Sequence, residues 1–336
     1  MDSAKAMTER HGTRYLTAAD VTAMMPPLEE RLALARTALI ALVSDADLPP
    51  KNSVHPRPDS SFGNAMPAYL RGLDPNGIDD LLGMKWVVGF PGNAELGLPQ
   101  IHGTVLLSDP RTGVPAAILD AGPITAERTA AVTGICLEAW CPRGRTRLRV
   151  SIIGAGTQAR SHLAVLSGLL PGSELAVYDR HPERARAIAE AALASGFHSV
   201  ATTRATAAAA VEGADVVLTM VSFGADRQLI PEEAFGRNVL VIAVDYDMCL
   251  PAGLARNAGL FLVDEARQYR AFRQTGLFVG YPDPDGTIGE WLGNGRKRPD
   301  GPLAIVHIGV GLTDVVFAHA IVRAAEERGV GVMLSP

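Results

Sequence analysis

The chain has 336 residues, a net charge of -5 and 47% apolar residues, a composition that excludes a disordered or fibrous protein and suits two globular domains. The negative charge gives no electrostatic footprint for a nucleic-acid backbone, and no apolar run is long enough to span a bilayer. We therefore expect no nucleic-acid partner and no membrane partner. The three cysteines form no CxxC pair and the polar N-terminus lacks a secretory signal, which favours the cytoplasm.

The first part of the chain opens with helical signals. Thr17 and Asp20 predict a capping box, and apolar residues then recur at helical spacing from Leu28 to Val43. The proline-rich stretch 49–67 predicts a loop or an edge strand, because proline has no backbone donor.

Short apolar runs with turn residues between them then predict a meander of strands over 83–90, 101–107 and 114–119. A helical pattern follows over 124–140. Beyond it, strand-like runs alternate with helical segments, which predicts a parallel sheet covered by helices on both faces. These runs are Leu148–Ile153, Leu175–Tyr178, Val200–Thr202, Val216–Val221, Val239–Val244 and Leu260–Val263.

A glycine-rich turn, Gly154-Ala155-Gly156-Thr157-Gln158-Ala159, follows the first of these runs and precedes a helical segment. Gly154 permits a tight turn, Gly156 lets the backbone approach a pyrophosphate, and Ala159 keeps the helix close to the sheet. These six residues are therefore predicted to bind a dinucleotide.

Asp179 ends the next strand-like run, where a carboxylate binds the ribose hydroxyls of NAD. Arg180 and Arg184 follow it and are placed to meet a 2′-phosphate. The sequence favours NAD and leaves NADP open.

The predicted fold class is α/β, with a Rossmann dinucleotide-binding domain over 129–312. The segment 1–128 forms a discontinuous α+β domain together with 313–336, because the last helix is expected to pack back on the first part of the chain.

The sequence resembles the ornithine cyclodeaminase and mu-crystallin family over nearly its whole length. Six ordered blocks carry the resemblance: Met66-Pro67-Ala68-Tyr69, Gly83-Met84-Lys85-Trp86, Phe90-Pro91-Gly92-Asn93, Asp109 with Thr112-Gly113-Val114-Pro115, Thr125 with Arg128-Thr129-Ala130-Ala131, and Gly309, Gly311 and Asp314. A narrower resemblance, to the tyramine oxidase-like branch of the family, is carried by 48–51, 55–58 and 65–68.

The resemblance implies hydride transfer between NAD(P) and the carbon that bears the amino or imino group of an amino acid or a cyclic imine. It also implies a homodimer and makes the α+β domain the substrate-binding and dimerisation domain. Two alternatives stay open: a redox-neutral amino-acid cyclodeaminase and a non-catalytic NAD(P)-binding subunit.

By resemblance, Lys85 is a catalytic residue that binds the substrate carboxylate or polarises the imine. Arg128 lies in the first turns of a helix, and its bidentate fork suits an α-carboxylate. We also count Arg128 among the cofactor-binding residues.

Asp247 follows the run 239–244 and aligns with the family's catalytic aspartate, so it is the predicted proton-transfer residue. Asp245 is the alternative for that role, or a helix cap. His307 precedes Ile308-Gly309 where family members approach the nicotinamide and substrate, although a structural histidine is at least as good an interpretation.

Two departures from the family bear on the substrate. Lys51 stands where cyclodeaminases carry an arginine that holds the carboxylate, and Asn64 replaces the glutamate of ornithine cyclodeaminase. Ornithine is therefore a doubtful substrate. The eight histidines show no metal-ligand spacing, and we predict no metal.

Overall fold

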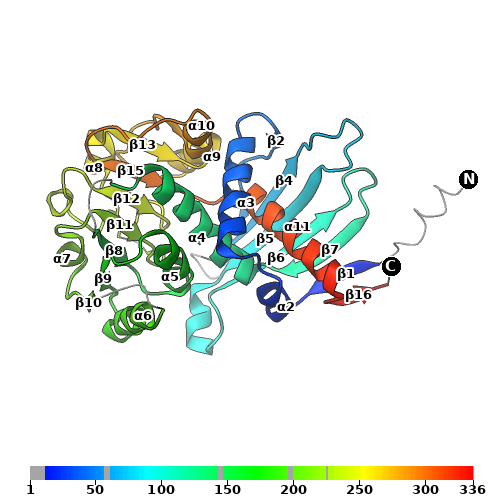
Figure 1. Ribbon diagram of the computed structural model, residues 1–336, viewed down its shortest axis with the longest axis horizontal. Helices are drawn as coiled ribbons and strands as arrows, with labels where there is room; N and C mark the ends of the chain where they lie inside the picture. The colour runs from blue at the N-terminus through cyan, green and yellow to red at the C-terminus, as the bar shows by residue number, and fades with distance from the viewer. Residues whose placement is uncertain (1–11, 57–60, 143–146, 196–199, 225, 336) are drawn as a thin grey trace, which may run out of the picture. The chain divides into compact units, whose positions relative to one another are not determined.

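The computed structural model describes residues 12–56, 61–142, 147–195, 200–224 and 226–335 (Figure 1). The chain divides into two compact units. Unit 1 comprises Met1–Pro27, Ser44–Arg128 and Val310–Pro336, and unit 2 comprises Leu28–Val43 and Thr129–Gly309. The expected domains counted 28–43 with the first part of the chain, whereas these residues belong to unit 2, where their helix packs against α10 (Ile288–Gly293).

Unit 1 is built on an eight-stranded sheet with the order β16-β1-β7-β6-β5-β4-β2, in which β3 also pairs with β4. Strands β5 to β7 form the expected meander, which is antiparallel, and β4 adds a further antiparallel strand beside β5. Helix α11 packs against β4, β5 and β6. The strands are β1 (Thr13–Leu16), β2 (Ala46–Asp47), β3 (Asn52–Val54), β4 (Phe62–Leu70), β5 (Leu81–Gly89), β6 (Ile101–Ser108), β7 (Pro115–Asp120) and β16 (Val332–Leu334), and the helices are α2 (Ala18–Ala23), the short 3₁₀ helix Pro91–Leu96 and α11 (Gly311–Arg328).

The expectation of a loop or edge strand over 49–67 is wrong for β4, which pairs with β5 along its whole length and with β2 and β3 on its other side. Strand β3 pairs with 63–65 and β2 pairs with 69–70, so Pro67 falls in the gap between these two short ladders. Its missing backbone donor therefore costs no hydrogen bond on that side. The capping box of Thr17 and Asp20 is present at the start of α2.

Unit 2 is built on an eight-stranded parallel sheet with the order β10-β9-β8-β11-β12-β15-β13-β14. Each of the six predicted runs overlaps a strand. The other two strands were not predicted: β15, which lies between β12 and β13, and the two-residue β14 at the edge of the sheet. The strands are β8 (Arg149–Ile153), β9 (Glu174–Tyr178), β10 (Ala201–Thr203), β11 (Val216–Thr219), β12 (Leu240–Ala243), β13 (Leu260–Val263), β14 (Gly286–Thr287) and β15 (Leu303–Val306).

The helices of unit 2 are α3 (Leu28–Ala41), α5 (Thr157–Leu169), α6 (Pro182–Ala194), α7 (Ala207–Val211), α8 (Ala252–Asn257), α9 (Ala266–Gln274), α10 and the short 3₁₀ helix Glu232–Ala234. Helix α4 (Ala121–Trp140) begins in unit 1 and ends in unit 2. The chain leaves β8 towards β9 and β10 and then returns to β11 on the other side of β8. This switch point is where doubly wound sheets bind their ligands. Among the described helices, none has the length and apolar character needed to cross a membrane.

Candidate active site

The glycine-rich turn lies at the switch point, between β8 and α5. Gly154 has a φ of 98°, and a Cβ there would lie 2.6 Å from the carbonyl oxygen of Met220, so only glycine suits the position. A Cβ at Gly156 would meet no described atom within 4 Å, and Gly156 precedes the first turn of the 13-residue helix α5. Ala159, in the first turn of α5, is fully buried. The turn therefore leaves open space in front of a helix N-terminus, as a pyrophosphate requires.

The carboxylate of Asp179 is fixed beside this turn. Its Oδ2 accepts a hydrogen bond from the backbone N–H of Ala155 at 2.7 Å, and its Oδ1 accepts one from the N–H of His181 at 2.8 Å. Each oxygen keeps a further lone pair for a ribose hydroxyl. Arg180 and Arg184 are exposed. The residues present fit a dinucleotide, with its pyrophosphate at α5 and its ribose at Asp179.

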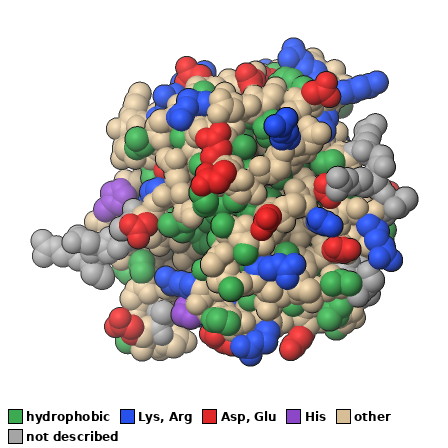
Figure 2. Space-filling model, turned by 90° about the vertical axis from the view of Figure 1, so that its left-hand side faces the viewer, with side chains coloured by type: hydrophobic (Ala, Val, Ile, Leu, Met, Phe, Trp, Pro, Cys, Tyr) green, Lys and Arg blue, Asp and Glu red, His purple; other side chains and the backbone are tan. Residues whose placement is uncertain are grey.

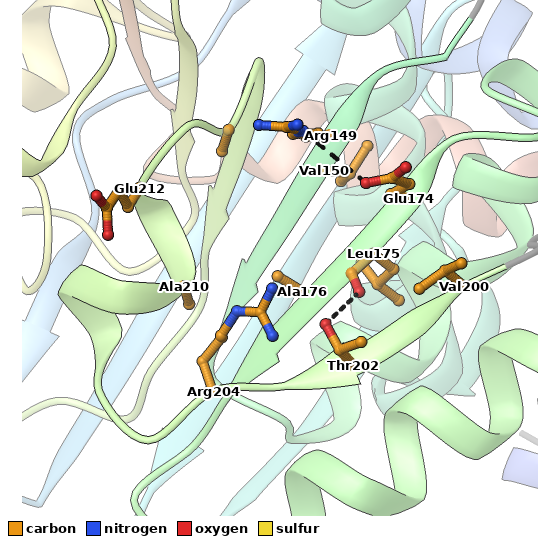
Figure 3. A pocket seen from close by; sticks show the side chains of 11 residues that line it. Arg149, Val150, Glu174, Leu175, Ala176, Val200, Thr202, Arg204, Ala210 and Glu212 are labelled. Atoms are coloured by element: carbon orange, nitrogen blue, oxygen red, sulfur yellow. Dashed lines mark hydrogen bonds and ion pairs between the residues drawn. The ribbon is translucent and has the colours of Figure 1, made fainter.

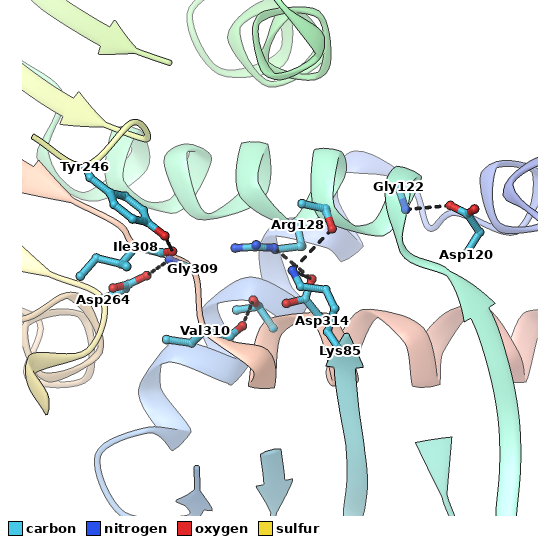
Figure 4. A network of polar contacts seen from close by, with 12 residues as sticks. Lys85, Asp120, Gly122, Arg128, Tyr246, Asp264, Ile308, Gly309, Val310 and Asp314 are labelled. Atoms are coloured by element: carbon cyan, nitrogen blue, oxygen red, sulfur yellow. Dashed lines mark hydrogen bonds and ion pairs between the residues drawn. The ribbon is translucent and has the colours of Figure 1, made fainter. Parts of the chain in front are cut away.

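A buried ionic cluster occupies the interior of unit 1 (Figure 4). The Lys85 Nζ donates to Oδ1 of Asp314 at 2.8 Å, and the Arg128 Nε donates to the same oxygen at 3.2 Å. Lys85 comes from β5, Arg128 from α4 and Asp314 from α11, and their exposed fractions are 1%, 6% and 0%. The alternation of β5 places the exposed Trp86 on the other face of the sheet.

The cluster holds two cationic side chains and one carboxylate, so it carries one net positive charge when all three groups are ionised. Burial, together with the charge of Arg128, lowers the pKa of Lys85 to about 7, although Asp314 opposes both effects. The other oxygen of Asp314, Oδ2, is buried and has no hydrogen-bond partner among the described residues. A net positive charge in so dry a place is stabilised by an anion, and the cluster is chemically suited to hold a carboxylate.

Lys51 and Asn64 lie near this cluster. Asn64 and Met66 of β4 pair with Val87 and Lys85 of β5, so Asn64 and Lys85 share one face of the sheet. The Asn64 Oδ1 accepts a hydrogen bond from the Ser53 hydroxyl at 2.7 Å. Lys51 lies close enough for its charge to contribute to lowering the pKa of Lys85.

Asp247 lies in unit 2, in the loop that follows β12, and it is 2% exposed. Its Oδ1 accepts a hydrogen bond from Arg227 Nη1 at 3.0 Å, and its Oδ2 accepts one from the backbone N–H of Phe278 at 2.8 Å. Tyr246 and Phe278 have φ values of 62° and 55°, which are rare for aromatic residues. The hydrogen bond to Phe278 therefore ties the carboxylate to a strained part of the backbone.

Asp245 lies two residues earlier and is also buried. Its Oδ1 accepts from the Thr219 hydroxyl at 2.6 Å and its Oδ2 from the Val221 N–H at 3.1 Å. Burial raises the pKa of Asp245 to about 6, although these hydrogen bonds oppose the rise. A carboxyl group that titrates near neutral pH can both give and take a proton.

His307 belongs to a chain of buried polar groups that sequence reasoning missed. Its Nε2 lies 3.1 Å from the hydroxyl of Thr133, which lies 2.9 Å from Nε2 of His162. Nδ1 of His162 lies 2.7 Å from the carbonyl oxygen of Gln158 in the glycine-rich turn. Neither Thr133 nor His162 has a local sequence signal, since each lies inside a helix.

A hollow of about 310 Å³ lies elsewhere in unit 2, beside the first residues of β8, β9 and β10 (Figure 3). Arg149, Glu174 and Arg204 stand around it, with small side chains such as Ala176 between them. Ligands of doubly wound sheets bind at the carboxyl ends of the strands, so this hollow is not the predicted dinucleotide site.

The charged side chains drawn in colour in Figure 2 are of both signs and lie among one another on the face shown. That face therefore offers a polyanion no continuous basic stripe. Among the described residues, no group of three or more His, Cys, Asp or Glu side chains is arranged to hold a metal ion.

Comparison with known proteins decides the family. The profile described as ornithine cyclodeaminase/mu-crystallin family matches residues 5–249. The chain belongs to this family. It is 28% identical over 340 residues to the nodulation efficiency protein NfeD of Rhizobium meliloti, covering 96% of this chain and 98% of that one.

Two solved structures show the same fold. Delta(1)-pyrroline-2-carboxylate reductase of Thermococcus litoralis, in complex with NADH and L-proline, has a TM-score of 0.81 at 22% identity, covering 95% of this chain and 99% of that one. An archaeal alanine dehydrogenase dimer with bound NAD has a TM-score of 0.81 at 24% identity, covering 96% and 99%. Both support the predicted α/β class.

Further relatives bear the names of the expected enzyme classes. They include the alanine dehydrogenase of Archaeoglobus fulgidus, delta(1)-pyrroline-2-carboxylate reductase of Bacillus cereus and ornithine cyclodeaminase of Brucella abortus. The family resemblance is thereby confirmed. The narrower resemblance to the tyramine oxidase-like branch finds no support in these relatives, and its residues 57 and 58 lie outside the described residues.

Proposed function

We propose that this protein is an NAD(P)-dependent oxidoreductase that transfers a hydride at the amino- or imino-bearing carbon of an amino acid or a cyclic imine. The observation that carries the proposal is the buried cluster of Lys85, Arg128 and Asp314, whose one net positive charge, when all three groups are ionised, matches one substrate carboxylate. The cluster occurs in a family whose members named above include a dehydrogenase and a reductase.

Arg128 is the main carboxylate-binding residue in this proposal. Its hydrogen bond to Asp314 uses Nε, which leaves the two terminal nitrogens of the guanidinium for a bidentate contact with the substrate. Lys85 binds the same carboxylate or polarises the imine, and Lys51 adds a positive charge nearby. Asp314 holds Lys85 and Arg128 in place without touching the substrate.

The proposed cofactor site is the glycine-rich turn. Bound NAD(P) supplies or accepts the hydride, which is chemistry that no side chain provides. The N-terminus of α5 holds the pyrophosphate, and Asp179 holds the ribose hydroxyls and disfavours a 2′-phosphate. NAD is therefore the proposed cofactor, and the exposed Arg180 keeps NADP as the alternative.

Asp247 is the proposed proton-transfer residue, with Asp245 as the alternative. Asp247 is supported by its alignment with the family's catalytic aspartate and by its place beyond β12, at the carboxyl edge of the sheet. Asp245 is supported by its pKa of about 6, which suits an acid and base near neutral pH. His307 is the proposed contact to the substrate beyond β15.

The substrate is proposed to carry one amino or imino group. Asn64 stands where ornithine cyclodeaminase has a glutamate, and its oxygen already accepts a hydrogen bond from Ser53. An amide gives a distal ammonium no charge partner, and an unpaired buried ammonium is heavily penalised. Ornithine is therefore expected to be a poor substrate.

We also propose a cytoplasmic homodimer that forms through unit 1. The face of β5 opposite Lys85 carries Met84 and Trp86, and Trp86 is 39% exposed. A half-exposed tryptophan on a sheet face is typical of a protein contact. Light scattering during gel filtration measures the mass, and Trp86→Glu is expected to convert dimers to monomers.

The test of the proposed function is a screen that follows the absorbance of the reduced nicotinamide. Cyclic imine carboxylates, and oxo acids with ammonia, are each supplied with NADH or NADPH, and Lys85→Met serves as the inactive control. Oxidation of NADH by at least one substrate supports the proposal. Conversion of ornithine with no net change of cofactor favours the cyclodeaminase instead, and silence despite dinucleotide binding favours a non-catalytic subunit.

A further inference from the structure

The chain of polar groups that begins at His307 lies wholly within unit 2. It runs from His307, directly after β15, to Thr133 on α4, then to His162 on α5, and ends at the carbonyl oxygen of Gln158. Thr133, His162 and His307 are each at most 2% exposed. Because water does not reach these side chains, each must find its hydrogen-bond donor or acceptor among other groups of the protein.

The direction of the hydrogen bond between His162 and Gln158 is fixed by its acceptor. A carbonyl oxygen can only accept, so His162 donates from Nδ1 to Gln158 at 2.7 Å. Burial lowers the pKa of His162 to about 4, so its ring carries a single proton at neutral pH. That proton is on Nδ1, and the Nε2 of His162 is therefore an acceptor.

The remaining two hydrogen bonds follow from this assignment. The Thr133 hydroxyl has one proton, which it donates to Nε2 of His162 at 2.9 Å. Towards His307, at 3.1 Å, the same oxygen can then only accept. His307 must supply a proton from Nε2.

We propose that Thr133 and His162 are positioning residues, which hold His307 as the tautomer protonated on Nε2 through a one-way chain of hydrogen bonds anchored at Gln158. The chain joins two places at the carboxyl edge of the same sheet. Gln158 lies in the first turn of α5, at the proposed pyrophosphate site, and His307 follows β15. The ring orientation of His307 is thus set from the dinucleotide-binding turn. The catalytic role of this orientation rests on the proposed function, whereas the assignment of the His307 tautomer is independent of that function.

The tautomer is read directly by long-range ¹H–¹⁵N correlation spectra of the full-length protein labelled with ¹⁵N-histidine. His162→Gln and His307→Gln assign the two sets of signals. We expect protonation on Nδ1 in His162 and on Nε2 in His307. Protonation of His307 on Nδ1 alone in the unmodified protein overturns the proposal.

Thr133→Val and Thr133→Ser form a matched pair, because valine keeps the shape and removes the hydroxyl while serine keeps the hydroxyl. Thr133→Val is expected to shift the ¹⁵N signals of His307 towards a mixture of tautomers, and Thr133→Ser to leave them as in the unmodified protein. Unchanged His307 signals in a folded Thr133→Val protein contradict the proposal.

Activity separates this proposal from the proposed function. With an active substrate, Thr133→Val is expected to lower kcat by about 10-fold while NADH affinity stays unchanged, and Thr133→Ser to restore kcat. A fall in NADH affinity with unchanged kcat contradicts positioning of His307. If no substrate is turned over, the proposed function fails, while the tautomer spectra still decide the assignment of the chain.

Discussion

Lys85 and Asp314 are 229 residues apart in the sequence, and their charged groups lie 2.8 Å apart in the interior of unit 1. The carboxylate also accepts from Arg128, so one anion restrains two cations. Breaking a buried ion pair on one side leaves an uncompensated charge, which is much costlier than removing an exposed pair. Asp314 is therefore expected to hold the site together.

Asp314→Asn tests that role. The substitution removes the negative charge that Lys85 and Arg128 share and leaves these two cations side by side. The free energy of unfolding is therefore expected to fall by about 2–4 kcal/mol at neutral pH. Chemical denaturation measures the change. Glu95→Gln is the control, because Glu95 is exposed in the same unit and its loss should stay within about 0.5 kcal/mol. Equal stability of the two variants contradicts the assignment.

The charge of the cluster predicts proton uptake when an anion binds. At about pH 8, Lys85 with its pKa of about 7 is mostly neutral. A bound carboxylate favours the ammonium and raises that pKa, so up to about one proton is taken up per site, and the uptake vanishes well below pH 7. Calorimetric titration with pyrrole-2-carboxylate in buffers of different ionisation enthalpy measures it. Lys85→Met should bind without uptake, and uptake that persists in this variant places the titrating group elsewhere.

Asp179 predicts the cofactor preference. NAD(H) should bind more tightly than NADP(H), because the carboxylate repels a 2′-phosphate and accepts from the ribose hydroxyls. Asp179→Asn should narrow the difference between the two affinities by at least about 10-fold. Quenching of tryptophan fluorescence gives both dissociation constants. At least tenfold tighter NADP(H) binding by the unmodified protein would show that Arg180 and Arg184 outweigh Asp179.

The activities of Asp247→Asn and Asp245→Asn show which of the two buried aspartates beyond β12 transfers the proton. Asp247→Asn is expected to keep dinucleotide affinity and to lower kcat by about 10²–10⁴-fold, the usual contribution of a general acid or base. Arg227→Met is the matched control, because it removes the ion partner and leaves the carboxylate in place. Thermal unfolding confirms that each variant is folded. If Asp245→Asn is inactive while Asp247→Asn turns over, the proton is moved by Asp245.

Local patterns predicted β5, β6 and β7 of the first sheet and six of the eight strands of the second, since alternation and short apolar runs depend on near neighbours in sequence. Whether a strand lies at the edge of a sheet depends instead on residues that are distant in the sequence. Pro67 is an example, because it fits in the middle of β4 where β3 and β2 leave a gap beside it. The four-residue run of β15 follows a stretch rich in glycine and proline, and its place between β12 and β13 depends on distant pairing.

In the candidate site, too, the features that depend on consecutive residues were predictable and those that depend on distant residues were not. The glycine-rich turn is predictable because its chemistry is contained in consecutive residues. Lys85 and Arg128 were found through the family resemblance, but the carboxylate that joins them comes from the far end of the chain. His162 was missed because a histidine inside a helix has no local mark that separates a structural role from a positioning role.

In the proposed reaction a hydride passes between the cofactor and the amino- or imino-bearing carbon. The most direct measurement uses NADH that carries deuterium at the transferring position of the nicotinamide, with a cyclic imine carboxylate as the acceptor, and analyses the product by mass spectrometry and NMR. We expect one deuterium in each product molecule, located on the α-carbon, and none with Lys85→Met. A reduced product without deuterium at the α-carbon would contradict the proposed reaction.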